Sequence, residues 1–117
     1  MALGANQPVP TISTHVLDTE LGAPAAGVHV TLYRLVDDGR PLRLTQALTD
    51  DDGRVADLMG RPLVAGDYRL EFNLAAGAGP DRFFRRLTLD LHVTDATRSY
   101  HVPLLMAPFS LTTYRGS

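Results

Sequence analysis

The side chains best suited to acid–base chemistry in this chain of 117 residues are those of its four histidines. An imidazole with its ordinary pKa of about 6.5 can accept or donate a proton close to neutral pH. Cysteine is absent, which excludes thiol catalysis, disulfide bonds and every zinc site that needs a cysteine ligand. All 11 basic residues are arginines, so Schiff-base chemistry on lysine is excluded as well. The histidines are His15, His29, His92 and His101.

His15 and His101 are distinguished by their neighbours. In residues 12–18 and 100–105 both histidines point away from the apolar parity, but Leu17 and Leu105 lie on the same outer faces. An apolar patch on an outer face is usually covered by a partner, so we expect a subunit interface there. An imidazole shielded in that way could act as a base or an acid. An ordinary interface histidine fits the same pattern.

Arg54 and the last four residues carry the remaining candidate groups. Arg54 follows Asp51-Asp52-Gly53 in an expected turn. There it is either an exposed loop residue or a guanidinium fork for a planar anionic or carbonyl-rich ligand. Residues 114–117 read Tyr-Arg-Gly-Ser and end the given sequence directly after an expected strand, where a frayed tail is the alternative to a specific role.

Other site chemistries have weaker support. A Ser-His-Asp arrangement can be assembled from Ser13 or Ser117, a histidine and Asp18, but no nucleophile-elbow motif accompanies it. Zinc binding by His15 and His101 lacks a carboxylate at a recognised spacing. The glycines at 77 and 79 precede a proline and not a helix, so no phosphate-binding loop is expected. We therefore expect no metal site.

Length and composition place these groups in one soluble domain. A chain of this size can bury about two-thirds of its unfolded surface, so we expect one domain over residues 11–117 after a flexible segment at 1–10. The net charge of -2 argues against a nucleic-acid partner. No apolar run reaches the roughly 18 residues of a membrane helix. The first ten residues lack the basic and apolar regions of a secretion signal, so we expect a cytoplasmic location.

Period-two alternation predicts an all-β fold. His29 and His92 occupy polar positions of alternating segments and are expected to face solvent. In another segment, Leu42, Leu44 and Leu48 are expected on one face. About eight short strands at this spacing are typical of a β-sandwich. The expected strands cover residues 12–18, 28–33, 42–48, 55–58, 68–74, 86–94, 100–105 and 111–114.

Turn residues separate these strands. Asp38-Gly39 predicts a hairpin, and Gly22-Ala23-Pro24 is expected to form a turn. Residues 75–80 contain two glycines and a proline, which favours a loop with at most one helical turn at its start.

Around the candidate residues His15, Arg54 and His101 and at residues 114–117, the chain resembles the 5-hydroxyisourate hydrolases, the transthyretin-related enzymes of purine catabolism. The resemblance spans residues 12–117. The terminal tetrapeptide is its most specific part, because transthyretin carriers, which share the fold, do not end this way. Three blocks carry it: Ser13-Thr14-His15-Val16-Leu17-Asp18 with Gly22 and Pro24-Ala25-Ala26-Gly27-Val28; Asp52-Gly53-Arg54; and Tyr100-His101-Val102-Pro103-Leu104-Leu105 with Pro108-Phe109 and residues 114–117.

The resemblance implies a transthyretin-like (prealbumin-like) sandwich of two four-stranded sheets, with a short or absent helix. It implies a homotetramer whose dimer–dimer interface holds the active sites. The implied reaction is hydrolysis of 5-hydroxyisourate to 2-oxo-4-hydroxy-4-carboxy-5-ureidoimidazoline, without a cofactor and without a nucleic-acid or membrane partner. Carried over by position, the catalytic group is His15, Arg54, His101 and Ser117, and the substrate pocket is shaped by Tyr114, Arg115 and Gly116.

In such a reaction His101 or His15 would take a proton from water, and Arg54 would stabilise the charge on the carbonyl oxygen. The second histidine or the Ser117 hydroxyl would protonate the leaving nitrogen. A non-catalytic carrier of small planar ligands and a plain interaction module are the alternative functions. A carrier or a scaffold has no reason to combine these residues, so their joint presence favours the hydrolase.

Two departures from the family pattern affect loops. Residues 75–80 look too short for the short helix that family members usually carry after the strand at 68–74. Arg85-Arg86 stands where a proline and an acidic residue are common, and Ser110-Leu111 replaces a usual Gly-Tyr. The catalytic set is complete in spite of these differences.

Overall fold

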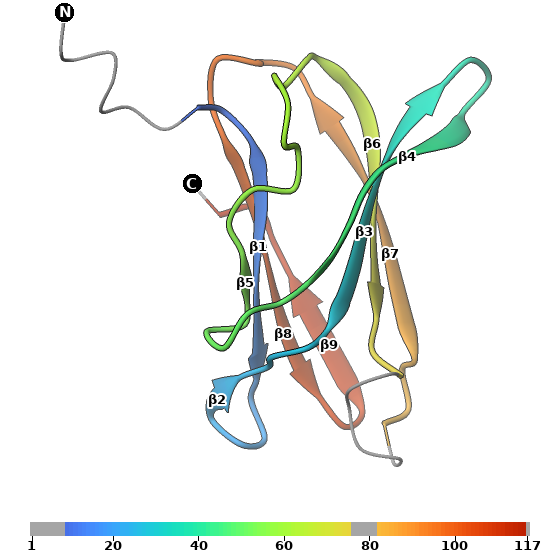
Figure 1. The fold of residues 1–117 in the computed structure, drawn as a ribbon. Coiled ribbons are helices and arrows are strands. Elements are labelled where there is room, and N and C mark those ends of the chain that lie inside the picture. Colours follow the sequence, from blue (N-terminus) through green and yellow to red (C-terminus); the bar gives the residue numbers. More distant parts are fainter. Residues whose placement is uncertain (1–8, 76–81, 117) are drawn as a thin grey trace, which may run out of the picture.

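Two packed β-sheets make up the part of the chain that the structure, a computed structural model, describes, namely residues 9–75 and 82–116 (Figure 1). All secondary structure in these residues is β, in nine strands. No helix among them is long and apolar enough to cross a lipid bilayer. The strands are β1 (Ile12–Asp18), β2 (Ala23–Pro24), β3 (His29–Val36), β4 (Arg40–Leu48), β5 (Arg54–Val55), β6 (Gly66–Asn73), β7 (Arg86–Val93), β8 (Tyr100–Ala107) and β9 (Ser110–Thr113).

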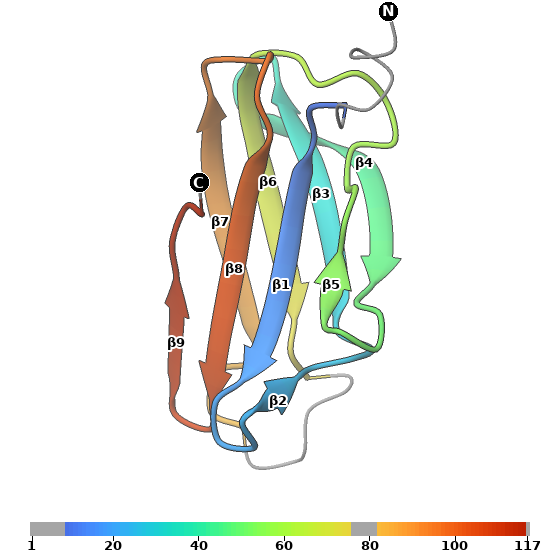
Figure 2. The same cartoon turned by 90° about the vertical axis from the view of Figure 1, so that its left-hand side faces the viewer.

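The first sheet has the order β2-β1-β8-β9, and β5 also pairs with β1. Its central pair, β1 and β8, is parallel, and every other pair in the two sheets is antiparallel. The second sheet has the order β4-β3-β6-β7. Figure 2 shows the first sheet in front of the second. The expected all-β sandwich of two sheets is confirmed, with the two-residue β5 as an addition to the first sheet.

Alternation along the strands builds the core between the sheets. In β1 and β6 every second residue is buried, because period-two side chains point to opposite faces of a sheet. Burying one large apolar side chain contributes about 1.5–3 kcal/mol relative to leaving it exposed. Side chains with no exposed surface include Ile12, Val16, Val30, Leu32, Tyr68, Leu70, Phe72 and Leu104.

All eight expected strands are present, with ends that differ by a few residues. The hairpin expected at Asp38-Gly39 is confirmed between β3 and β4, where Asp37 and Asp38 adopt positive φ angles of 26° and 57°. The turn expected at Gly22-Ala23-Pro24 is confirmed only at Gly22, which has a φ of 67°, since Ala23 and Pro24 form β2 on the edge of β1. Residues 1–8 and 76–81 lie outside the described residues, and with them most of the expected flexible segment and of the glycine-rich loop.

The shared face expected for Leu42, Leu44 and Leu48 is wrong. The register between β3 and β4 shifts at Leu32, which leaves Leu44 as the extra residue of a β-bulge. Leu44 packs against the core, whereas Leu42 and Leu48 are 53% and 56% exposed. Leu48 lies opposite the outward His29, and directly opposed residues share a face of the sheet. A bulge moves side chains between faces, and strict alternation cannot predict it.

A largely buried ion pair connects the end of β1 to the segment before β7. Arg82 Nη2 lies 3.4 Å from Asp18 Oδ2, and Arg82 Nη1 donates to the carbonyl of Ala107 at 3.1 Å. The two charged side chains are only 9% and 11% exposed. Asp18 Oδ1 also accepts the backbone N–H groups of Glu20 and Leu21, so the carboxylate holds the β1–β2 turn as well.

This pair should contribute to stability because removing one partner leaves a buried charge without compensation. We expect Arg82→Met to lower the free energy of unfolding by about 3 kcal/mol in urea denaturation. Arg40→Met is the matched control, since Arg40 pairs with Asp37 at 3.7 Å on a surface where both side chains are mostly exposed. Equal effects of the two substitutions would contradict a structural role for the buried pair.

Candidate active site

The parallel pairing of β1 with β8 brings the two distinctive histidines to one outer face. Ser13 lies beside His101 in the register, and His15 lies beside Pro103. The alternate residues of β1 are buried in the core, so Ser13 and His15 are left on the outer side. Strands that are 88 positions apart in the sequence therefore place their polar side chains within reach of each other.

Arg54 joins this face through the short strand β5. Arg54 is the register partner of His15, and Val16 donates its N–H to the carbonyl of Gly53 at 2.7 Å. Gly53 has a φ of 75°, and a Cβ atom there would lie 2.3 Å from the carbonyl oxygen of Val16. Only glycine fits this close approach. The sequence Asp-Gly-Arg therefore places the guanidinium beside β1.

Asp50 holds the turn that carries Arg54. Its Oδ1 atom accepts the backbone N–H groups of Asp52 and Arg54, both at 2.9 Å. Its backbone also exchanges hydrogen bonds with Gly53 and Arg54. An aspartate that bonds the backbone two residues ahead is typical of an Asx-turn. Sequence analysis missed Asp50 because it assigned the turn to the two aspartates that follow it.

His101 is bound on both sides of its strand. Ser13 Oγ lies 2.8 Å from His101 Nδ1, in a half-buried contact. On the other side, Gly116 donates its N–H to the His101 carbonyl at 2.7 Å and forms an isolated bridge with it. A Cβ atom at Gly116 would lie 2.9 Å from His101 Cδ2. The penultimate residue must therefore be small for the chain to pass this ring.

The surroundings of His101 favour a neutral imidazole. Partial burial, and then the positive charges of Arg54 and His15, lower the pKa of His101 below the ordinary histidine value of about 6.5. Within residues 9–75 and 82–116, its ring has no carboxylate partner to offset these effects. At neutral pH the imidazole is ready to accept a proton.

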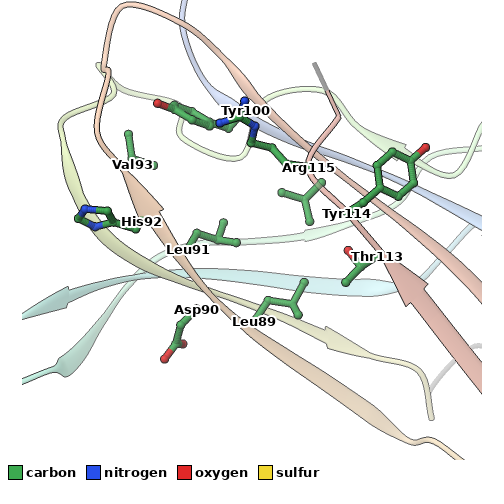
Figure 3. Close-up of a pocket in the computed structure, with 10 residues that line it drawn as sticks. Leu89, Asp90, Leu91, His92, Val93, Tyr100, Thr113, Tyr114 and Arg115 are labelled. Carbon is green, nitrogen blue, oxygen red and sulfur yellow. The ribbon is translucent and has the colours of Figure 1, made fainter.

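Tyr114 and Arg115 line a different hollow, at the open edge of the sandwich between β7 and β9 (Figure 3). This cavity of about 200 Å³ is walled mainly by apolar side chains such as Leu89 and Val102. The Arg115 guanidinium lies 5.9 Å from the centre of the buried Tyr100 ring. Arg115 thus leans toward the interior edge, while Gly116 lies against His101 on the outer side.

The structure therefore brings together His15, Arg54 and His101, with Gly116 alongside. Ser117 lies outside the described residues, and its place in the site stays a prediction. His92 faces solvent as expected, with 71% of its side chain exposed, and pairs with Asp67 at 2.7 Å. Ser13 was considered above only as a nucleophile, but it is the direct hydrogen-bond partner of His101. The sequence signal for this role was that Ser13 lies on the same face of its strand as His15.

This arrangement supplies a base beside a fixed cation. A neutral imidazole can remove a proton from water, and a guanidinium can stabilise an oxyanion. In the part of the chain that the structure describes, no group of three or more histidine, cysteine or acidic side chains is placed to hold a metal ion. A base and a guanidinium on one face are suited to acid–base chemistry on a carbonyl compound.

Comparison with known proteins gives a consistent result. Residues 12–116 match the model of the HIUase/Transthyretin family. The chain is 46% identical to a 5-hydroxyisourate hydrolase of Deinococcus radiodurans, over 92% of this chain and 97% of that protein. Its fold is similar to that of the Klebsiella pneumoniae 5-hydroxyisourate hydrolase, with a TM-score of 0.80, 38% identity, and 92% and 99% of the two chains covered. It is also similar to sea bream transthyretin in complex with thyroxine, with a TM-score of 0.81, 27% identity, and 90% and 93% covered.

The lowered pKa of His101 can be tested by titration. We expect its imidazole signals in NMR spectra to titrate below about pH 6.5, and Arg54→Gln to move this pKa part of the way back up, because burial remains. In the unfolded chain His101 has its ordinary pKa and therefore binds a proton more readily than in the folded protein. Its contribution to the stability of the fold is complete above about pH 6.5 and is lost as the pH falls through the lowered pKa.

Arg34→Gln, on the second sheet, is the control and should leave the titration of His101 unchanged. A His101 pKa at or above 6.5 in the native protein would contradict this interpretation of its surroundings.

Proposed function

The chain belongs to the HIUase/Transthyretin family, and on that premise we propose that it is a 5-hydroxyisourate hydrolase of urate degradation, with its active site on the outer face of β1, β5 and β8. The observation that carries the site is the convergence of His15, Arg54 and His101 from three distant stretches of sequence. The implied product is 2-oxo-4-hydroxy-4-carboxy-5-ureidoimidazoline.

His101 is the general base in the proposed mechanism. Water attacks a ring carbonyl of the substrate, a C–O bond forms, and His101 takes the proton that water loses. His101 is favoured over His15 in this step, because its lowered pKa keeps the imidazole neutral and Ser13 holds its ring. General base catalysis of this kind contributes about 10²–10⁴-fold in rate.

Arg54 stabilises the negative charge that builds on the carbonyl oxygen. A guanidinium stays charged at all working pH values and forms paired hydrogen bonds with planar groups. When the intermediate collapses, the ring C–N bond breaks and the nitrogen must gain a proton. The proton that His101 took from water can be passed to this nitrogen through His15, which lies beside Arg54, or through the Ser117 hydroxyl. His101 then returns to its neutral form, and the ring opens without a cofactor.

Assembly into a homotetramer completes the proposed site, with substrate bound at the dimer–dimer interface. In the protomer Arg54 is exposed, and Leu17 and Leu105 are only half-buried on the same outer face as the histidines. Covering this face with a second pair of subunits would exclude water and strengthen the electrostatic interactions within it. Gly116 would then border the substrate pocket beside His101. A contribution to the pocket from Tyr114 and Arg115, which line the edge cavity in the protomer, stays a prediction from the resemblance.

A non-catalytic carrier is the alternative function, because sea bream transthyretin shares the fold. A common fold does not decide between binding and catalysis. The higher identity to the hydrolases, 46% and 38% against 27%, and the presence of a base beside a guanidinium support the enzyme.

Turnover of 5-hydroxyisourate, generated by enzymatic oxidation of urate and followed by its ultraviolet absorbance, tests this proposal. We expect His101→Ala and Arg54→Ala each to lower kcat/KM by at least about 10²-fold, the scale of a lost base or oxyanion donor. His29→Ala, an outward histidine of the other sheet, is the control and should keep normal activity. Stoichiometric binding without turnover in the native protein would favour the carrier, and normal turnover of either variant would remove that residue from the mechanism.

The assembly can be tested on the same face. We expect Leu105→Asp to yield a smaller species in analytical ultracentrifugation and to lose activity in parallel, because a charge would be buried at the interface. Leu48→Asp introduces the same change on the outer face of the second sheet and should leave both size and activity unchanged. A fully active monomer would contradict the assembly.

A further inference from the structure

The hydrogen bond between Ser13 and His101 is unusual in that it orients a candidate base without a charge. Ser13 Oγ lies 2.8 Å from His101 Nδ1. The same chain contains the ordinary alternative, since His92 Nδ1 is held by the carboxylate of Asp67 at 2.7 Å on an exposed strand. The chain thus orients one histidine with a carboxylate and the other with a hydroxyl.

A hydroxyl suits a base that must remain neutral before the reaction. A carboxylate beside the ring would favour the imidazolium and raise its pKa. A serine hydroxyl carries no charge, and its oxygen can accept a hydrogen bond from Nδ1–H in both protonation states of the ring. Ser13 can therefore fix the ring without opposing the effects of burial, Arg54 and His15.

We propose that Ser13 is the positioning residue of His101: its Oγ accepts a hydrogen bond from Nδ1–H, which fixes the tautomer in which Nε2 is unprotonated and available to take a proton from water. The proposal rests on the proposed function. When Nε2 gains that proton, both ring nitrogens carry hydrogen and Ser13 keeps the same bond. The imidazolium then lies near the positive charge of Arg54, which favours passing the proton on to the leaving nitrogen.

The position of Ser13 is set by rigid backbone. Its neighbours Ile12 and Thr14 are buried on the inner side of β1. Thr14 Oγ1 donates to the carbonyl of Val102 at 2.6 Å, and Tyr100 donates its N–H to the carbonyl of Thr11 at 2.8 Å. These bonds lock β1 and β8 on both sides of the Ser13–His101 pair. A side chain held between such anchors keeps a fixed geometry.

The charged groups around His101 come from two elements. Arg54 approaches from β5, and His15 lies two residues beyond Ser13 on β1. Its own strand presents the neutral Pro103 as the next residue on that face, and Gly116 of the terminal segment has no side chain. A carboxylate placed at residue 13 would be the first negative group beside the ring among the residues described.

Substitutions at residue 13 separate positioning from structure. We expect Ser13→Ala to lower kcat about tenfold or more with little change in KM, because the ring loses its tautomer and orientation. Ser13→Thr keeps the hydroxyl and should restore most of the rate. Ser13→Asp should move the acid limb of the pH–kcat profile upward by about 1–3 pH units, because a carboxylate raises the pKa of His101.

Ser99→Ala is the matched control. Ser99 Oγ accepts the Thr11 N–H at 3.0 Å, between the residues that directly precede the two strands, whereas the side-chain partner of His101 is Ser13. This variant should match Ser13→Ala in any loss of stability and keep the native kcat. If Ser13→Ala keeps the native kcat too, or if Ser13→Asp leaves the acid limb in place, the positioning role is wrong and the proposed function still stands.

The tautomer of His101 is a readout that does not depend on turnover. Nitrogen-15 NMR of the native protein, above the pKa of His101, should report the Nδ1–H form, and Ser13→Ala should shift the ring toward Nε2–H. A native ring in the Nε2–H form overturns the proposal. Native protein that fails to turn over substrate overturns the proposed function, and this spectrum still decides how Ser13 is bonded.

Discussion

The parallel pairing of β1 with β8 is the constraint on which the site depends. In a parallel pair, residues in register present their side chains side by side on one face. Here the register sets Ser13 against His101, and the same strand carries His15 two residues further on. A shift by one residue would turn all of these side chains into the core. The apolar alternate residues, such as Ile12 and Val16, prevent that shift because they are fully buried.

Among the described residues, the electrostatics of this face follow from the lack of a carboxylate beside His101 as much as from the groups that are present. Its neighbours are a guanidinium, a second imidazole and a hydroxyl, in a half-buried setting. Each of these leaves the ring neutral or disfavours its charged form. The exposed His92 has the opposite setting, with an aspartate on Nδ1. Both histidines occupy outward positions of strands, and they differ in burial and in the partner of Nδ1.

Alternation in the sequence was sufficient to predict the strands and the outward direction of His15 and His101, because both follow from local period-two patterning. The place of Arg54 beside His15 could not be predicted in that way. It depends on a two-residue strand, on the Asx-turn of Asp50 and on the tight approach of Gly53. The bulge at Leu44 and the short pairing of β2 are likewise products of tertiary packing. Motif resemblance supplied the link to Arg54 that periodicity lacked.

Two consecutive residues near the end of the chain contact different parts of the fold. Arg115 reaches the edge cavity beside Tyr100, and the next residue, Gly116, is bonded to the backbone of His101. A molecule or subunit bound in that cavity would contact a residue whose next neighbour in the chain is bonded to His101. The edge of the sandwich and the outer face of β8 are thus joined through two consecutive residues.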